Sequence, residues 1–403
     1  MLYNANQFIA HGSLTNSKRP SVFVEGIYPT HVESGNKCYL MAEKKRYLDF
    51  ICALGSNYFG YANPEIQQAI VDQLKKGTLY SLGSNLEIEV AELFCNYFKL
   101  EKLRFLKTGT EACMAAIKIA RSYTNKKYIV SEGYHGWSDI FVSLTPPANG
   151  VVGNFAIIDF PTYQLNKEKI KDNIAAFIIE PVITEYIERK DWLFKLHEEA
   201  EKIESLVIYD ETITGYRFPK GSVSSYFDTF PDLQIFGKAI GAGMPLAIIG
   251  GKKNIMESEY FVSSTFAGDT IALMAAKQGL KLINSSHNPQ TLWDQGKKFI
   301  SEINQITGEI VQFEGYPTRG ILTGDDLNKA LFMQECCKAG ILIGPSWFLN
   351  FDMIIEFDNI KSIFMSVINK IKNKEVRLEG KMPIKPYAQQ MRDKNESLFR
   401  KDN

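Results

Sequence analysis

The sequence predicts an α/β protein whose larger domain is built on a mostly parallel β-sheet. Continuous apolar runs recur along the middle of the chain, they alternate with helical patterns, and polar or glycine-rich residues follow most of them at once. Apolar runs without alternation are expected where helices cover both faces of a strand, as in a parallel sheet. The predicted strands are Tyr128–Val130, Ala175–Ile179, Leu206–Tyr209 and Leu246–Ile249.

Length and charge limit the classes of function. A chain of 403 residues is too long for one small core, so one large domain and one smaller domain are expected. Its 46 basic residues balance 46 acidic ones, and there is no Lys/Arg block of the kind that binds nucleic acid or an acidic membrane. We therefore expect the substrate to be a small molecule.

Cysteine usage and hydropathy predict the compartment. The six cysteines show no CxxC spacing, and two of them, Cys336 and Cys337, are adjacent, which favours a reducing cytoplasm over a disulfide framework. No stretch approaches the roughly 20 apolar residues that a membrane span needs, and the N-terminus does not resemble a signal peptide. We expect a soluble, unprocessed, cytoplasmic protein.

Before the predicted sheet, short strands and turns give way to helices. The first sixty residues contain strand-like pieces at Ser21–Val24 and Cys38–Leu40. Helical periodicity then predicts one helix over Pro64–Lys76 and another over Glu87–Phe98. We expect residues 1–55 to contribute to the small domain and residues 56–285 to form the large one.

After about residue 285 the pattern becomes that of a compact α+β domain, which we expect to span residues 286–403 with its tail. The pattern predicts strands at Glu309–Phe313 and Ile341–Ile343 and a helix at Lys361–Ile371. The charged tail from Asn373 onward carries two prolines, and we expect it to wrap the surface.

Two charged residues carry the main chemical signal. Asp210 ends the apolar run Leu206–Tyr209, and Lys238 follows it by 28 residues (238 − 210) within a glycine-rich segment. A dehydrated lysine favours its neutral amine, which can form a Schiff base with an aldehyde. A carboxylate can pair with a pyridinium nitrogen, so the two together suggest pyridoxal phosphate. Taken singly, Asp210 could equally be a turn carboxylate, and Lys238 is more simply a surface lysine.

Weaker signals surround this pair. Thr110 is predicted to cap a helix, and Gly109 before it lets an anion such as phosphate approach the backbone. Tyr134 lies between two glycines and could stack on a flat ring, whereas His135 beside it is more simply a structural histidine than a general base. The histidines show no metal-like spacing. Alone, each of these segments is an ordinary helix start or loop.

Together these motifs resemble the class III aminotransferases of pyridoxal-phosphate fold type I, nearest the glutamate-1-semialdehyde 2,1-aminomutase branch. The similarity runs from about residue 12 to about residue 370. The segments that match family motifs are Thr108–Ala112, Gly133–Gly136, Ile179–Val182, Asp210–Arg217 and Gly237–Lys238. The resemblance implies a mostly parallel seven-stranded sheet.

The resemblance also implies a role for each matching residue at the cofactor ring. Lys238 would form the internal aldimine and later move the proton of the substrate carbon, and Asp210 would keep the pyridine nitrogen protonated. Tyr134 would stack on one face of the ring, and Thr212, which stands where the family has valine, would pack against the other.

Phosphate binding and assembly follow from the resemblance in the same way. Gly109 and Thr110 would hold the phosphate. Thr265, in the segment Ser264–Gly268, would reach the phosphate of the neighbouring subunit, so a homodimer with shared active sites is expected.

Departures from the family pattern bear on the reaction. Where the aminomutase branch places a glutamate beside the substrate, this chain has Leu349. Arg19 is a candidate clamp for a substrate carboxylate, with a solvated basic turn as the alternative, and Glu180 either binds substrate or braces the site. We therefore predict an aminotransferase that moves an amino group between a donor and a small anionic aldehyde or ketone, with a sugar-derived carbonyl as one candidate. An aminomutase and a non-catalytic pyridoxal-phosphate-fold binding protein are the alternatives.

Overall fold

The computed structural model describes residues 5–144 and 148–392 and divides into two compact units. The larger unit holds residues 64–290 and resumes at Met391, whereas the smaller unit holds residues up to 63 together with 291–390. None of the described helices combines the length and hydropathy that crossing a membrane would require. All six cysteines are free thiols.

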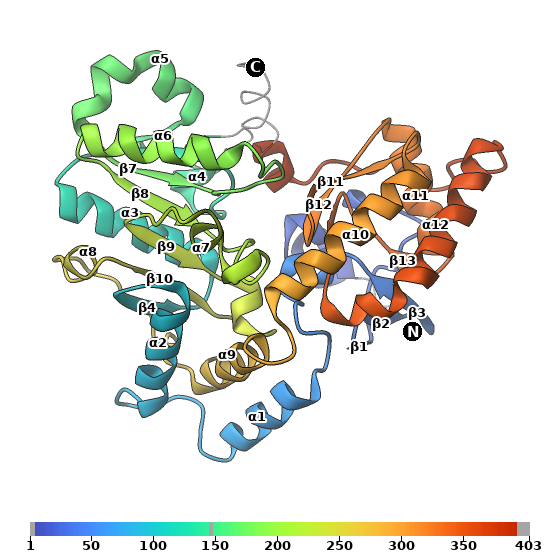
Figure 1. Cartoon of the computed structure of the whole chain (residues 1–403), viewed down its shortest axis with the longest axis horizontal. Helices are drawn as coiled ribbons and strands as arrows, with labels where there is room; N and C mark the ends of the chain where they lie inside the picture. Colours follow the sequence, from blue (N-terminus) through green and yellow to red (C-terminus); the bar gives the residue numbers. More distant parts are fainter. Residues whose placement is uncertain (1–4, 145–147, 393–403) are drawn as a thin grey trace. The chain divides into compact units, whose positions relative to one another are not determined.

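A seven-stranded sheet forms the centre of the larger unit, which confirms the prediction (Figure 1). The strands lie in the order β4-β10-β9-β8-β7-β5-β6, and only β10 runs antiparallel to its neighbours. Each predicted apolar run lies in a strand, except that Leu246 comes directly before β10. The strands are β4 Lys102–Leu106, β5 Tyr128–Glu132, β6 Ile157–Asp159, β7 Ile174–Ile179, β8 Leu206–Asp210, β9 Leu233–Phe236 and β10 Ala247–Gly251.

Helices surround this sheet, and the two that the periodicity predicts, α1 and α2, are present within two residues of their expected ends. Ser84 caps α2, and Glu87 bonds back to it in a capping box. The helices are α1 Pro64–Leu74, α2 Asn85–Phe98, α3 Gly109–Thr124, α4 Asp139–Val142, α5 Phe160–Ile170, α6 Arg189–Lys202, α7 Val223–Phe227, α8 Lys253–Met256 and α9 Thr270–Ile283.

Strand alternation decides which helix each side chain of β8 meets. Ile208 belongs to the core cluster that includes the buried face of α3. Its neighbour Tyr209 points the other way, where its hydroxyl lies 2.8 Å from Nε2 of His197 on α6. Because successive side chains of a strand point to opposite faces, Asp210 shares the α3 face with Ile208. Helices α3 and α6 thus cover opposite faces of the sheet (Figure 1).

Helix α3 begins two residues earlier than a cap at Thr110 would require. Thr108 is the N-cap: its hydroxyl accepts a hydrogen bond from the backbone N–H of Glu111 at 3.2 Å, and Glu111 Oε2 accepts one from the N–H of Thr108 at 3.0 Å. The prediction that Thr110 caps this helix is wrong, because the reciprocal bonds of a capping box favour Thr108. Thr110 lies in the first turn instead.

The smaller unit holds two small sheets, β1-β2-β3-β13 and β11-β12-β14, and three long helices. The strand predicted at Ser21–Val24 is wrong, since Pro20 starts a 3-10 turn there. The other predicted elements are present with shifted ends. The elements are β1 Ser34–Asn36, β2 Tyr39–Ala42, β3 Lys45–Asp49, α10 Pro289–Thr307, β11 Gln312–Tyr316, β12 Arg319–Thr323, α11 Asp326–Lys338, β13 Ile341–Leu342, β14 Ser346–Phe348 and α12 Phe357–Lys372.

The turn at Gly136 requires glycine for two reasons, its backbone conformation and a close neighbour. Gly136 has φ +105°, and a Cβ there would lie 2.2 Å from Oγ1 and 2.9 Å from Cα of Thr110. Gly150 has φ +82° with nothing within 4 Å of its Cβ position. We expect Gly136→Ala to lower the free energy of unfolding by about 1–3 kcal/mol more than Gly150→Ala, as measured by urea denaturation. Equal losses would show that the close approach to Thr110 does not matter.

Candidate functional site

The carboxyl ends of four neighbouring strands lie at one edge of the sheet. Tyr209 on β8 pairs with Ile179 on β7, which in turn pairs with Glu132 on β5. On its other side, β8 pairs through Asp210 with Ile235 on β9. The segments that follow these strands therefore start at the same level, where ligands of parallel sheets bind. This is the edge at which the sequence places the predicted site residues.

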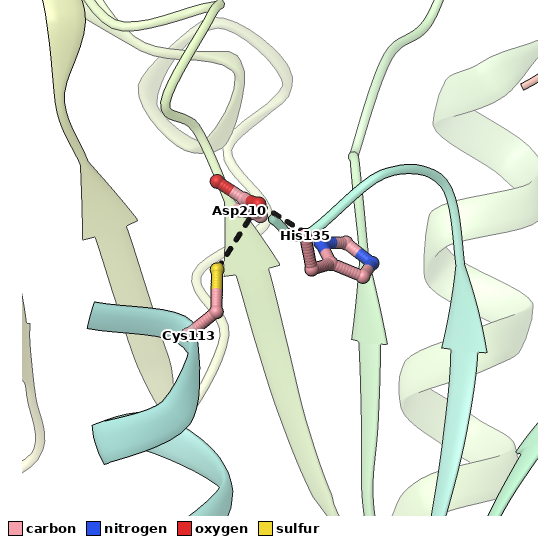
Figure 2. Close-up of side chains that lie close together, drawn as sticks. All are labelled: Cys113, His135 and Asp210. Carbon is pink, nitrogen blue, oxygen red and sulfur yellow. Dashed lines mark hydrogen bonds and ion pairs between the residues drawn. The ribbon is translucent and has the colours of Figure 1, made fainter. Parts of the chain in front are cut away.

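Asp210 is buried at the end of β8 and accepts hydrogen bonds on both oxygens. Oδ1 accepts from the backbone N–H of Thr212 at 3.1 Å and from its hydroxyl at 2.5 Å. Oδ2 accepts from the thiol of Cys113 at 3.3 Å and lies 2.8 Å from Nδ1 of His135 (Figure 2). The carboxylate is thus held from α3, from the turn after β5 and from its own loop.

The surroundings keep Asp210 ionised. Burial alone would raise its pKa, but the hydrogen bond and charge of His135, the Thr212 hydroxyl and the charge of Lys238 together hold the pKa below its ordinary 3.8. Nε2 of His135 lies 3.0 Å from the carbonyl oxygen of Glu132, so both ring nitrogens face acceptors. These two contacts fix the orientation of the imidazole ring beside Asp210.

Lys238 begins a short turn after β9, with φ 48°. Burial, followed by the positive charge of Arg392, lowers its pKa from 10.5 to about 8, although Asp210 and Glu180 oppose the shift. The lowered pKa enlarges the neutral fraction of the amine at pH 7 by about two powers of ten. The neutral amine is the nucleophilic form of a lysine.

Thr212 lies between the helix start and the lysine segment. A Cβ on Gly109 would lie 3.2 Å from Cγ2 of Thr212, and one on Gly237 would lie 3.1 Å from the same atom. The free backbone N–H groups at the start of α3, which favour an anion, are thereby close to the segments of Asp210 and Lys238. An anion site, a carboxylate for a cationic ring nitrogen and a neutral amine for an aldehyde fit the functional groups of pyridoxal phosphate.

The loop after Asp210 is fixed by a second buried carboxylate. Glu211 accepts hydrogen bonds from the backbone N–H groups of Val223 at 2.6 Å and Ser224 at 3.1 Å, and from the hydroxyl of Thr214 at 2.9 Å. Burial nevertheless raises the pKa of Glu211. These bonds hold the loop, and with it Thr212, in place.

Glu180 forms a buried ion pair that the sequence did not predict. Nε and Nη2 of Arg392 bond to its two oxygens at 2.8 and 2.9 Å, and the Tyr134 N–H donates to Oε1 at 2.8 Å. The Arg392 guanidinium also lies 5.7 Å from the Tyr134 ring centre. Burial would raise the pKa of Glu180, but Arg392 outweighs it and lowers the pKa. The expectation that the tail wraps the surface is wrong for Arg392, which is 7% exposed.

The other two predicted site residues, Arg19 and Thr265, belong to other segments of the chain. Arg19 belongs to the smaller unit, directly before the turn Pro20–Val22. Thr265 belongs to the larger unit and is exposed, between Phe261 and Phe266, which are 79% and 60% exposed. Their roles stay predictions.

Comparison with known proteins agrees with this geometry. Residues 25–348 match the family model described as aminotransferase class-III. Curated relatives include two proteins named glutamate-1-semialdehyde 2,1-aminomutase. The one from Wigglesworthia glossinidia brevipalpis is 29% identical and covers 92% of this chain and 98% of its own length. The one from Thermosipho africanus is 33% identical over 68% of this chain and 71% of its own length.

Solved structures show the same fold at low sequence identity. The FumI protein of Sphingopyxis, in its PLP internal aldimine form, superposes with a TM-score of 0.84 at 19% identity, covering 94% of this chain and 97% of its own. An omega-transaminase from Sphaerobacter thermophilus has a TM-score of 0.81 at 22% identity and covers 91% and 96%. The sheet and its helices are therefore those of this group of structures.

Removing Arg392 should leave the buried charge of Glu180 without its counter-ion. We expect Arg392→Met to lower the free energy of unfolding by about 3–5 kcal/mol, because Glu180 is left buried without its cation. The double variant Glu180→Gln, Arg392→Met should lose less. Urea denaturation measures both. Lys75→Met, which removes the exposed partner of Asp72, serves as the control and should change little. If Arg392→Met lost no more free energy of unfolding than the double variant, the ion pair between Arg392 and Glu180 would be contradicted.

The pKa of Lys238 predicts how its reactivity depends on pH. Only the neutral amine is acylated, so the rate of acetic anhydride labelling at Lys238, followed by peptide mass spectrometry, should rise with a midpoint near pH 8. The positive charge of Arg392 disfavours the protonated amine, so its removal in Arg392→Met should move the midpoint upward. A midpoint near that of free lysine in the unaltered protein would refute the assignment.

Proposed function

Since the chain belongs to the class III aminotransferase family, we propose that it binds pyridoxal phosphate through Lys238 and moves an amino group from a donor to a small anionic aldehyde or ketone. The observation that carries the proposal is the pairing at one sheet edge of an ionised Asp210 with a Lys238 amine whose pKa is lowered to about 8. A non-catalytic binding protein would have no need of that amine.

Each residue of the site then has a defined task. Bound pyridoxal phosphate supplies an electron sink for the charge left when the substrate carbon loses its proton. Asp210 keeps the ring nitrogen protonated, which sustains that sink. Lys238, once the substrate amine has taken its place, accepts the proton from the carbon and returns it. The amine is suited to both steps because its pKa is close to neutral.

The remaining side chains bind and orient. Tyr134 and Thr212 would cover the two faces of the cofactor ring, and Gly109 with Thr110 would hold the phosphate at the start of α3, where backbone N–H groups favour an anion. Glu180 anchors the turn that carries Tyr134 by accepting its backbone N–H. These roles follow from the family motifs, and the close approach of Gly109 and Gly237 to Thr212 supports them.

An anionic substrate is the expected partner of Arg19, which we propose as the clamp for a substrate carboxylate. The choice between the two reactions of this group rests on Leu349, which is fully buried where the aminomutase branch has a carboxylate. We therefore propose exchange between two substrate molecules. The names of the curated relatives favour the second candidate, an aminomutase that moves the amino group within one molecule.

The chain is proposed to work as a homodimer in which Thr265 contacts the cofactor phosphate of the neighbouring subunit. The exposed rings of Phe261 and Phe266 on either side of Thr265 are typical of a surface that another subunit covers. Six free thiols are compatible with a reducing, cytoplasmic compartment.

The first experiment tests the covalent link. Protein incubated with pyridoxal phosphate and reduced with borohydride should carry the cofactor on the Lys238 peptide. Lys238→Ala should carry none, while its unfolding transition remains cooperative. An unlabelled Lys238 in the unaltered protein would overturn the proposal.

A second experiment separates the reactions. Amino donors supplied without acceptor should convert the bound cofactor to its amine form, which absorbance detects. Glutamate-1-semialdehyde supplied alone should yield no 5-aminolevulinate. Formation of 5-aminolevulinate would establish the aminomutase instead, and a cofactor that no donor changes would favour the binding protein.

A further inference from the structure

The thiol of Cys113 lies in the cofactor-binding region, yet the proposed reaction assigns it no task. It sits in the second turn of α3, is 1% exposed and donates to Asp210 Oδ2 at 3.3 Å (Figure 2). Burial, and next the charge of Asp210, raises its pKa well above the ordinary range. Cys113 therefore keeps its proton and acts as a hydrogen-bond donor rather than as a thiolate.

Cys113, His135 and Asp210 also form a group with the composition of a metal site. Their potential ligand atoms lie within 4.8 Å of one another, and no other such group occurs in the part of the chain that the structure describes. Two observations favour hydrogen bonds over a metal. The 2.8 and 3.3 Å separations from Oδ2 are hydrogen-bond lengths. The thiol of Cys113 keeps its proton, which a metal ion would have to displace.

The four donors to Asp210 differ in their freedom. On Oδ2, His135 is fixed because its other nitrogen bonds to the carbonyl of Glu132, and Cys113 is enclosed in the core cluster. On Oδ1, the backbone N–H of Thr212 is fixed, but its hydroxyl can turn away by rotation about one bond. Oδ1 is thus the oxygen that can exchange one partner for another.

We propose that Cys113 is a positioning residue: with His135 it holds Oδ2 of Asp210, and so presents Oδ1 to the ring nitrogen of the cofactor. This inference rests on the proposed binding of pyridoxal phosphate. The thiol touches neither the substrate nor the reacting atoms, and it acts only through the orientation of the carboxylate. Its loss should therefore be felt by a ligand that has a ring nitrogen and not by one that lacks it.

The test compares two ligands on the apoprotein. Dissociation constants are measured by fluorescence titration for pyridoxal phosphate and for its 1-deaza analogue, which has carbon in place of the ring nitrogen. Cys113→Val should weaken binding of pyridoxal phosphate by about threefold to tenfold and leave the analogue unchanged. Cys113→Ser keeps a donor and should bind both ligands nearly as the unaltered protein does. Cys95→Val, at a half-buried thiol of α2, is the control for loss of a cysteine.

Each other outcome overturns the inference. Equal weakening of both ligands by Cys113→Val would mean that the thiol only fills space, and no weakening would mean that it has no role. Stoichiometric Zn²⁺ binding to the apoprotein that Cys113→Val abolishes would make the thiol a metal ligand. If Cys113→Val does not fold, Cys113→Ala decides by the same comparison. Failure of the unaltered protein to bind pyridoxal phosphate would instead refute the proposed function.

Discussion

The buried charge of Asp210 is the constraint on which the larger unit depends. A carboxylate removed from water is stable only where donors and opposite charges replace its hydration. Cys113, His135 and the backbone N–H and hydroxyl of Thr212 meet this requirement by their contacts with the two carboxylate oxygens. Strand β8 positions the carboxylate, and α3, the turn after β5 and the loop after β8 supply the side chains and the N–H group that surround it.

Charges of alternating sign continue along the same sheet edge. His135 lies against Asp210 and Arg392 against Glu180, and the charges of Arg392, Asp210 and Glu180 all act on Lys238. Burial and the charge of Arg392 outweigh the opposing charges of Asp210 and Glu180, so the pKa of Lys238 is lowered. The edge therefore stabilises two anions and still leaves an amine that is partly neutral at physiological pH.

Local patterns predicted what depends on local chemistry. The strands follow from their apolar runs, and Asp210 and Lys238 stand out because each ends or follows such a run. The Thr-x-x-Glu spacing from Thr108 to Glu111 is also a local pattern, and it predicts the cap at Thr108. The glycine at position 109 favours Thr110 only if it is interpreted as the residue before the helix. Arg392 could not be found locally, since its partner is 212 residues away and its own segment is polar and charged. Ser21–Val24 has strand-like composition, which Pro20 overrides.

The way the chain passes between the units has a consequence for its synthesis. The larger unit stops at residue 290, and the chain builds residues 291–390 of the smaller unit before it returns with Arg392. On the ribosome, Arg392 is therefore translated 212 residues after Glu180, and residues 291–390 of the smaller unit come between the two segments of the larger one. Until Arg392 has been translated, water must solvate the Glu180 carboxylate. The buried ion pair between the two residues therefore forms only after the smaller unit has been synthesised.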